Sequence, residues 1–255
     1  MTDIVNDYGP VAWLYDTYVR VVFDLPFFRQ EAARATGPVL ELAAGTGRIS
    51  EVLVAAKVVV TCVDVSRDML RVLKRKLGGV AKPPLVVCAD MRRLPFQDYY
   101  HLVVIPFNSF LEITDERDRM QTLSEVRRVL MPGGRLVCTL HNPTVRRRSF
   151  GSDPRLLGQF EVPGSGGNLE VWVSETWKPE TEVAEAVQTY RLYDAHGSLE
   201  REQVMRVRFS LIEQPAFVSM ARESGFEVVE LLGDYDRSEF NAESSPYMIW
   251  ILQRS

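Results

Sequence analysis

Three acidic residues and a glycine-rich turn are the parts of this sequence whose types and spacing could do chemistry. The stretch VLELAAGTGRIS is apolar as far as Glu41, then turns small, with Gly45 and Gly47 before polar residues resume. Glycine permits positive φ and lets a ligand approach the backbone closely. Asp64 and Asp90 end the next two apolar runs. Asp64 follows Glu41 at close to the spacing of about 20 residues at which an acid meets ribose hydroxyls in nucleotide-binding sheets.

These residues together predict a nucleoside site. In an open parallel sheet, ligands lie outside the carboxyl ends of the strands. The alternative is that Glu41, Asp64 and Asp90 are merely solvated strand ends, but three such acids beside a glycine turn favour a site. Ser50 stands where a dinucleotide fingerprint needs its third glycine, so a pyrophosphate site is not expected.

Apolar runs alternating with helical segments must position these residues. Continuous Val, Ile and Leu runs separated by helices are typical of a parallel sheet with helices on both faces. We therefore predict an α/β fold, a Rossmann-like and mostly parallel seven-stranded sheet. The predicted strands include PVLELA, VVVTCVDV, PLVVCAD, HLVVIPF and GGRLVCTLH, and the predicted helices cover 47–56, 67–77, 115–130 and 215–224.

The pattern changes after the fifth strand. Three extended segments, LEVWVSETWK, EAVQTYRLYD and REQVMRVRFSL, are separated by turn signals. They predict an antiparallel β insertion over residues 151–212, which is too small to be an independent domain. We therefore expect one domain over residues 1–255, with a helical cap at residues 1–36 and the insertion as a roof over the substrate.

Composition limits the partners. The formal net charge is −4, which gives no electrostatic reason to expect a nucleic-acid or membrane-surface protein. Lys57 and Asp64 interrupt the best apolar run, and acidic residues occupy the start of the chain, so neither a membrane span nor a signal peptide is expected. The three cysteines fall in predicted strands without metal-ligand spacing, which indicates buried thiols in a reducing compartment. We expect a cytoplasmic protein with no metal, and the oligomeric state stays open.

The motifs jointly resemble those of class I S-adenosylmethionine-dependent methyltransferases. LELAAGTGRIS is similar to the first motif of this family, CVDVSRDML to its second-strand motif and CADMRRLPF to its third. VRRVLMPGGRLV is similar to the segment that leads into the fifth strand, and ARESGFEVVEL to the penultimate strand region. The resemblance covers about residues 8–141 and is to the small-molecule type, including amino-sugar and glycine N-methyltransferase-like enzymes. It implies S-adenosylmethionine as methyl donor and S-adenosylhomocysteine as product.

The resemblance also implies which residues hold the cofactor. Asp64 would bind both ribose hydroxyls, Asp90 would accept from the adenine amino group, and Glu41 would lie beneath the methionyl amino group. Tyr8 and Tyr15 match the region from which a tyrosine folds over the cofactor in related enzymes, although plain aromatic packing is the alternative. The other cofactor-binding positions that the resemblance implies are Ala43, Gly45, Gly47, Val65, Met69, Met91, Phe107 and Asn108.

Two residues are candidates for a general base, which is needed if the nucleophile arrives protonated. Glu112 stands in the loop PFNSFLEI, where small-molecule members of the family often place a histidine. It could orient or deprotonate an amine, or be a solvated carboxylate at a helix start. His141 closes the fifth strand at the ligand end of the sheet. It could act as a base, or simply bond the following loop.

The expected function is methyl transfer from S-adenosylmethionine to a nitrogen or oxygen of a small-molecule acceptor, with no nucleic-acid or membrane partner. One alternative is methylation of RNA or protein, which needs a broad basic groove beside the cofactor. Others are a non-catalytic S-adenosylmethionine-binding protein and a nicotinamide oxidoreductase. Aromatic residues of the insertion could line the acceptor pocket, or pack onto the main domain: Trp172, Trp177, Tyr190 and Tyr193.

Overall fold

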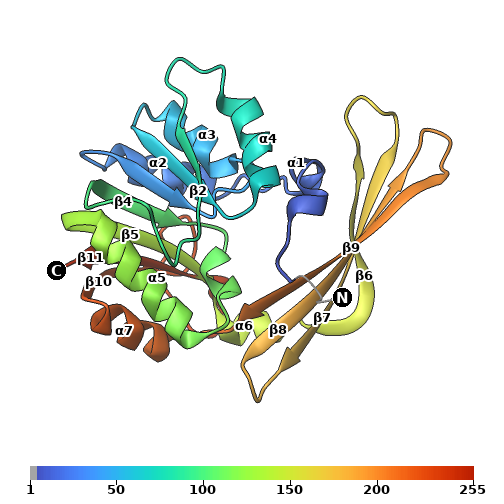
Figure 1. Ribbon diagram of the computed structural model, residues 1–255. Helices are drawn as coiled ribbons and strands as arrows, with labels where there is room; N and C mark the ends of the chain where they lie inside the picture. Colours follow the sequence, from blue (N-terminus) through green and yellow to red (C-terminus); the bar gives the residue numbers. More distant parts are fainter. Residues whose placement is uncertain (1–4) are drawn as a thin grey trace.

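Two β-sheets organise the computed structural model, which describes residues 5–255 (Figure 1). The larger sheet is parallel except for its strand β11, which is antiparallel to both of its neighbours. The predicted seven-stranded, mostly parallel α/β sheet is therefore confirmed. In order across the sheet its strands are β10 (Phe226–Leu232), β11 (Tyr247–Arg254), β5 (Leu130–His141), β4 (Tyr100–Ile105), β1 (Val39–Leu42), β2 (Val60–Asp64) and β3 (Leu85–Cys88).

The strand order reverses at β1. β1 pairs in parallel with β2 on one side and with β4 on the other, so the chain builds the sheet outward in both directions from this strand. At such a reversal the loops that follow neighbouring strands turn to opposite faces, which leaves a crevice at the carboxyl ends. The first glycine-rich turn follows β1 and therefore lies at this crevice.

Helices cover both faces of the sheet, as the sequence predicts. Alternate strand residues point to opposite sides, so Val39 packs with one set of helices while Leu40 packs with the other. No helix within residues 5–255 is long and apolar enough to cross a membrane. One face carries α2 (Leu25–Ala33), α3 (Arg48–Ala55) and α4 (Arg67–Leu77), and the other carries α5 (Glu116–Val129) and α7 (Gln214–Glu223).

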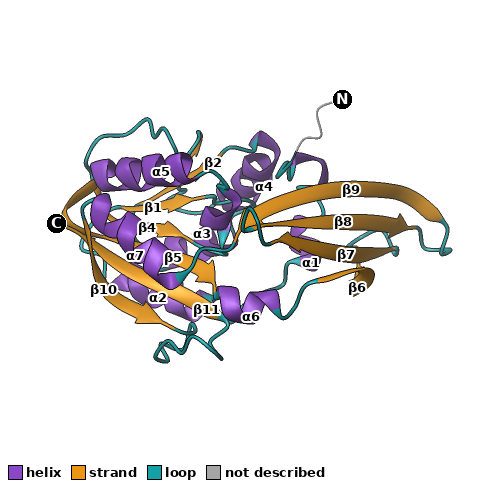
Figure 2. Cartoon of the chain, turned by 90° about the horizontal axis from the view of Figure 1, so that it is seen from below, coloured by secondary structure: helices purple, strands orange, loops and turns teal. Residues whose placement is uncertain are grey.

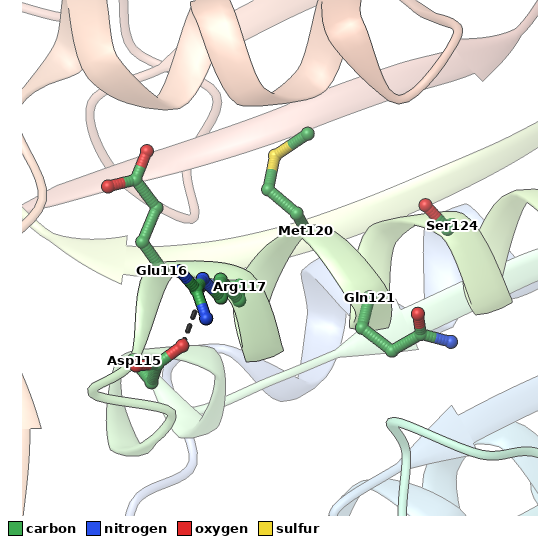
Figure 3. A pocket seen from close by; sticks show the side chains of 6 residues that line it. All are labelled: Asp115, Glu116, Arg117, Met120, Gln121 and Ser124. Carbon is green, nitrogen blue, oxygen red and sulfur yellow. Dashed lines mark hydrogen bonds between the residues drawn. The ribbon is translucent and has the colours of Figure 1, made fainter.

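Side-chain caps fix where α4 and α5 begin. Ser66 accepts a hydrogen bond from the backbone N–H of Met69, and Asp115 accepts from the backbone N–H groups of Arg117 and Asp118. Figure 3 shows the Asp115 cap at the start of α5, beside a hollow on the outside of this helix. All the residues that line this hollow come from α5 and its cap, so it is a depression on one helix.

The chain after β5 forms the predicted antiparallel insertion as a second sheet. Figure 2 shows it extending away from the larger sheet, with α6 (Pro143–Arg147) at the junction. The sequence predicted three of its strands and missed the first. Pro154 and Gly158 interrupt that segment, and its pairing shifts register twice, as is typical of an edge strand. The four strands are β6 (Gly151–Glu161), β7 (Asn168–Lys178), β8 (Val183–Tyr193) and β9 (Leu199–Ser210).

The N-terminal segment connects the two sheets. Val5 forms an isolated bridge with Arg206 at the free edge of β9, and the side chain of Asn6 bonds the backbone of Arg208. The chain then continues through η1 (Gly9–Val11) and α1 (Tyr15–Tyr18) to α2. Short helices therefore occupy the described part of the predicted 1–36 cap, and residues 1–4 of that range lie outside the described residues.

The cysteines differ in burial. Cys62 and Cys138 are buried in strands of the larger sheet, and Cys88 is exposed. The prediction that all three thiols are buried is wrong for Cys88, because β3 is the outermost strand of the sheet and lacks a neighbour on its far side.

Candidate active site

A cavity of about 770 Å³ lies at the carboxyl ends of the parallel strands, between the larger sheet, the N-terminal segment and the four-stranded sheet. Its lining includes every predicted site residue except Glu41 and Gly47. The loops after five neighbouring strands contribute, as expected for a site at the point where strand order reverses. The predicted residues that line the cavity are Tyr8, Tyr15, Ala43, Gly45, Asp64, Val65, Met69, Asp90, Met91, Phe107, Asn108, Glu112 and His141.

The two glycines of the turn after β1 are required for different structural reasons. Gly45 has φ of 55°, and a Cβ added there would meet no atom within 4 Å, so the backbone faces open cavity. Gly47 has φ of 89° and lies at the start of α3, where a Cβ would be 2.8 Å from Cγ of Leu73. Gly47 therefore serves the packing of α3 against α4, and its place under the cofactor stays a prediction.

Asp64 is a fixed carboxylate at the end of β2. One of its oxygens accepts from the backbone N–H of Gly45 and the other from that of Ser66, both at 2.8 Å. Burial raises the pKa of Asp64, while these backbone N–H donors oppose the rise. Each carboxylate oxygen can accept more than one hydrogen bond. Asp64 lines the cavity, so both oxygens retain capacity for a ligand with two neighbouring hydroxyl groups.

Asp90 is already paired with Arg92, an arginine that was not among the predicted site residues. Nε of Arg92 lies 3.0 and 2.9 Å from the two carboxylate oxygens of Asp90, and Arg92 also contacts Asp118 at 2.5 Å. Hydrogen bonding from Arg92 holds the pKa of Asp90 below its usual value. Arg92 lines the cavity as well. The signal in the sequence was an arginine two residues after the strand-end acid, within CADMRRLPF.

Glu41 lies under the turn and does not line the cavity. It is 1% exposed, and its carboxyl accepts a hydrogen bond from Oγ of Ser50 at 2.6 Å. Burial raises the pKa of Glu41 to about 8. Glu41 is therefore buried behind the cavity wall, and its place beneath the methionyl amino group stays a prediction.

The loop after β4 carries two unusual backbone conformations. Phe107 and Asn108 have φ of 57° and 64°, in the left-handed region that residues other than glycine seldom adopt. Oδ1 of Asn108 is buried and has no hydrogen-bond partner among the described residues, although Asn108 lines the cavity. Strained backbone and a buried acceptor without a partner concentrate at ligand sites. The guanidinium of Arg48 supports Phe107 from 4.9 Å.

Glu112, at the end of η2 (Ser109–Glu112), is half-buried in the cavity. The hydroxyl of Tyr8 donates to Oε1 of Glu112 at 2.8 Å. Burial raises the pKa of Glu112 to about 7, and the hydrogen bond from Tyr8 opposes this rise. Glu112 can therefore gain or lose a proton near neutral pH, unlike a solvated carboxylate at a helix start.

His141 is in a different electrostatic state. Burial, followed by the positive charge of Arg146, lowers the pKa of His141 to about 3. The imidazole stacks on Tyr247, with ring centroids 6.1 Å apart. An imidazole with so low a pKa holds a proton poorly, so it is the weaker of the two predicted bases. It remains available as a neutral hydrogen-bonding group.

The N-terminal tyrosines lie over the cavity. Tyr8 packs edge-on against Tyr15, with ring centroids 6.1 Å apart, and both line the cavity. Asp16, beside them, accepts from the hydroxyl of Thr46 at 2.5 Å and pairs with Lys76 at 2.9 Å. These contacts fasten the N-terminal segment to the glycine turn and to α4, and the folding of a tyrosine over the cofactor stays a prediction.

Replacing Tyr8 by phenylalanine tests the coupling between this segment and Glu112. The change removes the hydroxyl that stabilises the charged carboxylate, so the pKa of Glu112 should rise further. We expect the ascending limb of the pH–rate profile to move up by about one pH unit. Tyr15→Phe is the matched control, because no hydrogen bond joins the Tyr15 hydroxyl to Glu112. If the ascending limb of the pH–rate profile stays in place in Tyr8→Phe, Tyr8 does not set the pKa of Glu112.

The four-stranded sheet lines the far side of the cavity with residues other than the expected aromatics. Tyr190 is 1% exposed, packs inward and bonds the hydroxyl of Tyr18 at 2.9 Å and Oε1 of Gln188 at 2.5 Å. Trp172, Trp177 and Tyr193 do not line the cavity either. The residues of this sheet that do so are Glu175, Ala186, Gln188, Val207 and Phe209.

Comparison with known proteins agrees with the motifs and the fold. Residues 39–134 match the family model described as a methyltransferase domain. A demethylmenaquinone methyltransferase of Clavibacter sepedonicus is 38% identical over 125 residues, which is 46% of this chain and 49% of that protein. The chain thus spans about half the length of this curated relative. The expected resemblance is confirmed for the part of the chain that carries the cofactor motifs.

Solved structures extend the likeness to the whole fold. A S-adenosylmethionine-dependent methyltransferase from Clostridium acetobutylicum has a TM-score of 0.81 at 15% identity, covering 97% of this chain and 99% of that chain. The sugar N-methyltransferase KedS8 from Streptoalloteichus sp. has a TM-score of 0.77 at 18% identity, covering 100% of this chain and 95% of that chain. The fold is therefore the class I methyltransferase fold, including the added antiparallel sheet.

Proposed function

We propose that this protein transfers a methyl group from S-adenosylmethionine to a nitrogen or oxygen of a small-molecule acceptor. The observation that carries the proposal is a single cavity shared by two sets of residues. The first set, Gly45, Asp64 and Asp90, suits a nucleoside. The second set, Glu112 and the inner side of the four-stranded sheet, suits a second ligand. Two reactants that are held and aligned in one cavity need little further assistance to react.

The residues present fit this cofactor. The open backbone at Gly45 leaves room for a chain of atoms against the turn, and Asp64 has acceptor capacity for two ribose hydroxyls. Oδ1 of Asn108 is a buried acceptor that a positively charged or N–H-bearing group would satisfy. Carboxylates outnumber guanidinium groups in the cavity lining, which suits an ammonium and a sulfonium. When bound, S-adenosylmethionine supplies an already activated methyl group.

Glu112 is the residue proposed to prepare the acceptor. An ammonium or hydroxyl placed beside Glu112 can pass its proton to a carboxylate oxygen, which frees the lone pair that attacks the methyl carbon. A general base works best when its pKa is close to the working pH, and burial gives Glu112 such a value. Tyr8 holds one oxygen of Glu112 in place, so the other is free to face the acceptor.

The shape and charge of the cavity favour a small acceptor over RNA or protein. Two basic residues, Arg92 and Arg146, are found among the described residues that line the cavity. Arg92 pairs with Asp90 and Asp118, and Arg146 pairs with Glu175. A broad basic groove, which a nucleic acid would need, is therefore not what this lining offers. The demethylmenaquinone methyltransferase and the sugar N-methyltransferase named above both act, by their names, on small molecules.

The proposal is tested by binding and by label transfer. Titration calorimetry should show binding of S-adenosylhomocysteine and no binding of NAD. The protein is then incubated with methyl-labelled S-adenosylmethionine and a cell extract that has been divided by ultrafiltration into small molecules and macromolecules. Label is expected in the small-molecule fraction. Label in the macromolecules supports the RNA or protein alternative, cofactor binding without label supports a binding protein, and no cofactor binding overturns the proposal.

A further inference from the structure

Two arginines share one buried carboxylate at the end of the cavity formed by the four-stranded sheet. Glu175 in β7 has a side chain that is 7% exposed, and it points inward from this sheet. Arg146 of α6 donates to both of its oxygens, and Arg155 of β6 lies 2.9 Å from Oε2, one of the same two oxygens. Arg146 and Glu175 line the cavity, whereas Arg155 does not. The cluster therefore carries one positive charge more than its single carboxylate neutralises.

Aromatic rings hold the guanidinium of Arg146 in place. It lies 4.7 Å from the ring centroid of Phe150 and 5.3 Å from that of Phe209. Its side chain is 15% exposed, so little water surrounds it. A guanidinium fixed in this way offers planar, preorganised donors, and its electrostatic interactions are stronger than at the protein surface.

The cluster reaches the cavity through Arg146 and Glu175. The positive charge of Arg146 is one cause of the lowered pKa of His141, which lines the same end. The acidic groups Asp64 and Glu112 lie instead at the end of β2 and in η2, which follows β4. Arg146, with its partner Glu175, is thus the cationic group that the cavity offers at the end formed by the four-stranded sheet. Glu175 is shared between Arg146 and the half-exposed Arg155, so a negative group beside Arg146 would balance the remaining charge of the cluster.

We infer that the acceptor carries an anionic oxygen group, a carboxylate or a phosphate, that binds Arg146. This inference rests on the proposed function and adds the chemical class of the acceptor. Arg146 is then a specificity-determining residue: it anchors the anionic end while Glu112 faces the nucleophile. The competing explanation is that Arg146 and Glu175 only tie α6 to β7. A tie of that kind would affect stability without any preference for anions.

The experiment uses calorimetry on the full chain loaded with S-adenosylhomocysteine, with three probes. Benzoate offers a carboxylate on a ring that suits the aromatic walls, benzamide is its neutral counterpart, and inorganic phosphate is the second anion. We expect at least one anion to bind at least about tenfold more tightly than benzamide. Preference for benzoate over phosphate identifies a carboxylate, and the reverse preference identifies a phosphate.

Variants decide which residue is responsible. Arg146→Gln should weaken anion binding at least about tenfold, while Arg148→Gln, the matched control in an exposed arginine outside both the cavity and the cluster, should change it by less than about threefold. If Arg146→Gln is unstable, Arg146→Lys keeps the charge but loses the planar donors, and it should still weaken binding. Glu175→Gln removes the competing carboxylate, so anion affinity should stay the same or increase.

Three results would overturn the inference. They are equal affinity for benzoate, phosphate and benzamide, undiminished anion affinity in Arg146→Gln, or loss of anion binding in Glu175→Gln. Affinity for S-adenosylhomocysteine is measured first in each protein. Failure of the unsubstituted chain to bind it contradicts the proposed function, whereas cofactor binding without anion preference contradicts only the inference about the acceptor.

Discussion

Glu112→Gln should lower kcat by a factor of about 10²–10⁴, because general acid–base catalysis contributes this much when a proton must leave in the transition state. Glutamine keeps the size of the side chain and can still accept the hydrogen bond from Tyr8 at its carbonyl oxygen. It cannot take up a proton. Affinity for S-adenosylhomocysteine, measured by calorimetry, should stay within about twofold.

The pH dependence gives this prediction a second readout. Burial raises the pKa of Glu112 to about 7, and only the deprotonated carboxylate can act as a base. The value of kcat/KM should therefore rise as pH increases through about 7 and level off above it. In Glu112→Gln this ascending limb should disappear, because the titrating group is gone.

Glu116→Gln is the matched control for Glu112→Gln. Glu116 lies four residues further along, in the exposed first turn of α5, and its replacement should leave the rate unchanged. His141→Ala should have a smaller effect than Glu112→Gln, because the low pKa of His141 makes it a poor proton acceptor. A full rate in the double variant of Glu112 and His141 would exclude both residues as bases.

Asp64→Ala should weaken binding of S-adenosylhomocysteine at least tenfold, and by about 10²-fold if both ribose hydroxyls bond the carboxylate. Hydrogen bonds to a charged group contribute about 1.5–3 kcal/mol each, and 1.4 kcal/mol corresponds to tenfold. The change also frees the backbone N–H groups of Gly45 and Ser66, which loosens the turn. Calorimetric titration of S-adenosylhomocysteine measures the loss.

Two further variants separate these contributions. Asp64→Asn keeps one acceptor oxygen for the backbone, so it should weaken binding less than Asp64→Ala. Asp68→Asn, on the exposed side of α4 where Asp68 pairs with Arg71, should leave affinity unchanged. Unfolding in urea confirms that each variant remains folded. Unchanged affinity in a folded Asp64→Ala protein would count against the ribose assignment.

The sequence by itself determined the sheet and most of the cavity lining. Buried parallel strands are continuous apolar runs, so they are visible locally, and α4 was predicted at the observed bounds, Arg67–Leu77. Residues that follow such strands must meet at one edge of the sheet, which is why Asp64, Asp90 and Asn108 could be placed together. The edge strand β6 was missed because an exposed strand with proline, glycine and shifted register has no apolar pattern.

Only the tertiary structure decided the charge and partners of these residues. Tyr8 and Glu112 are 104 positions apart, and the contact between Arg146 and Glu175 spans 29, so no local pattern reveals either pair. Burial raises the pKa of Glu112 and lowers that of His141, because it disfavours the charged form of each group. Burial depends on how the N-terminal segment and the four-stranded sheet close over the cavity. That closure comes from contacts between distant parts of the chain. It decides which of the two candidate bases, Glu112 or His141, can accept a proton from the acceptor.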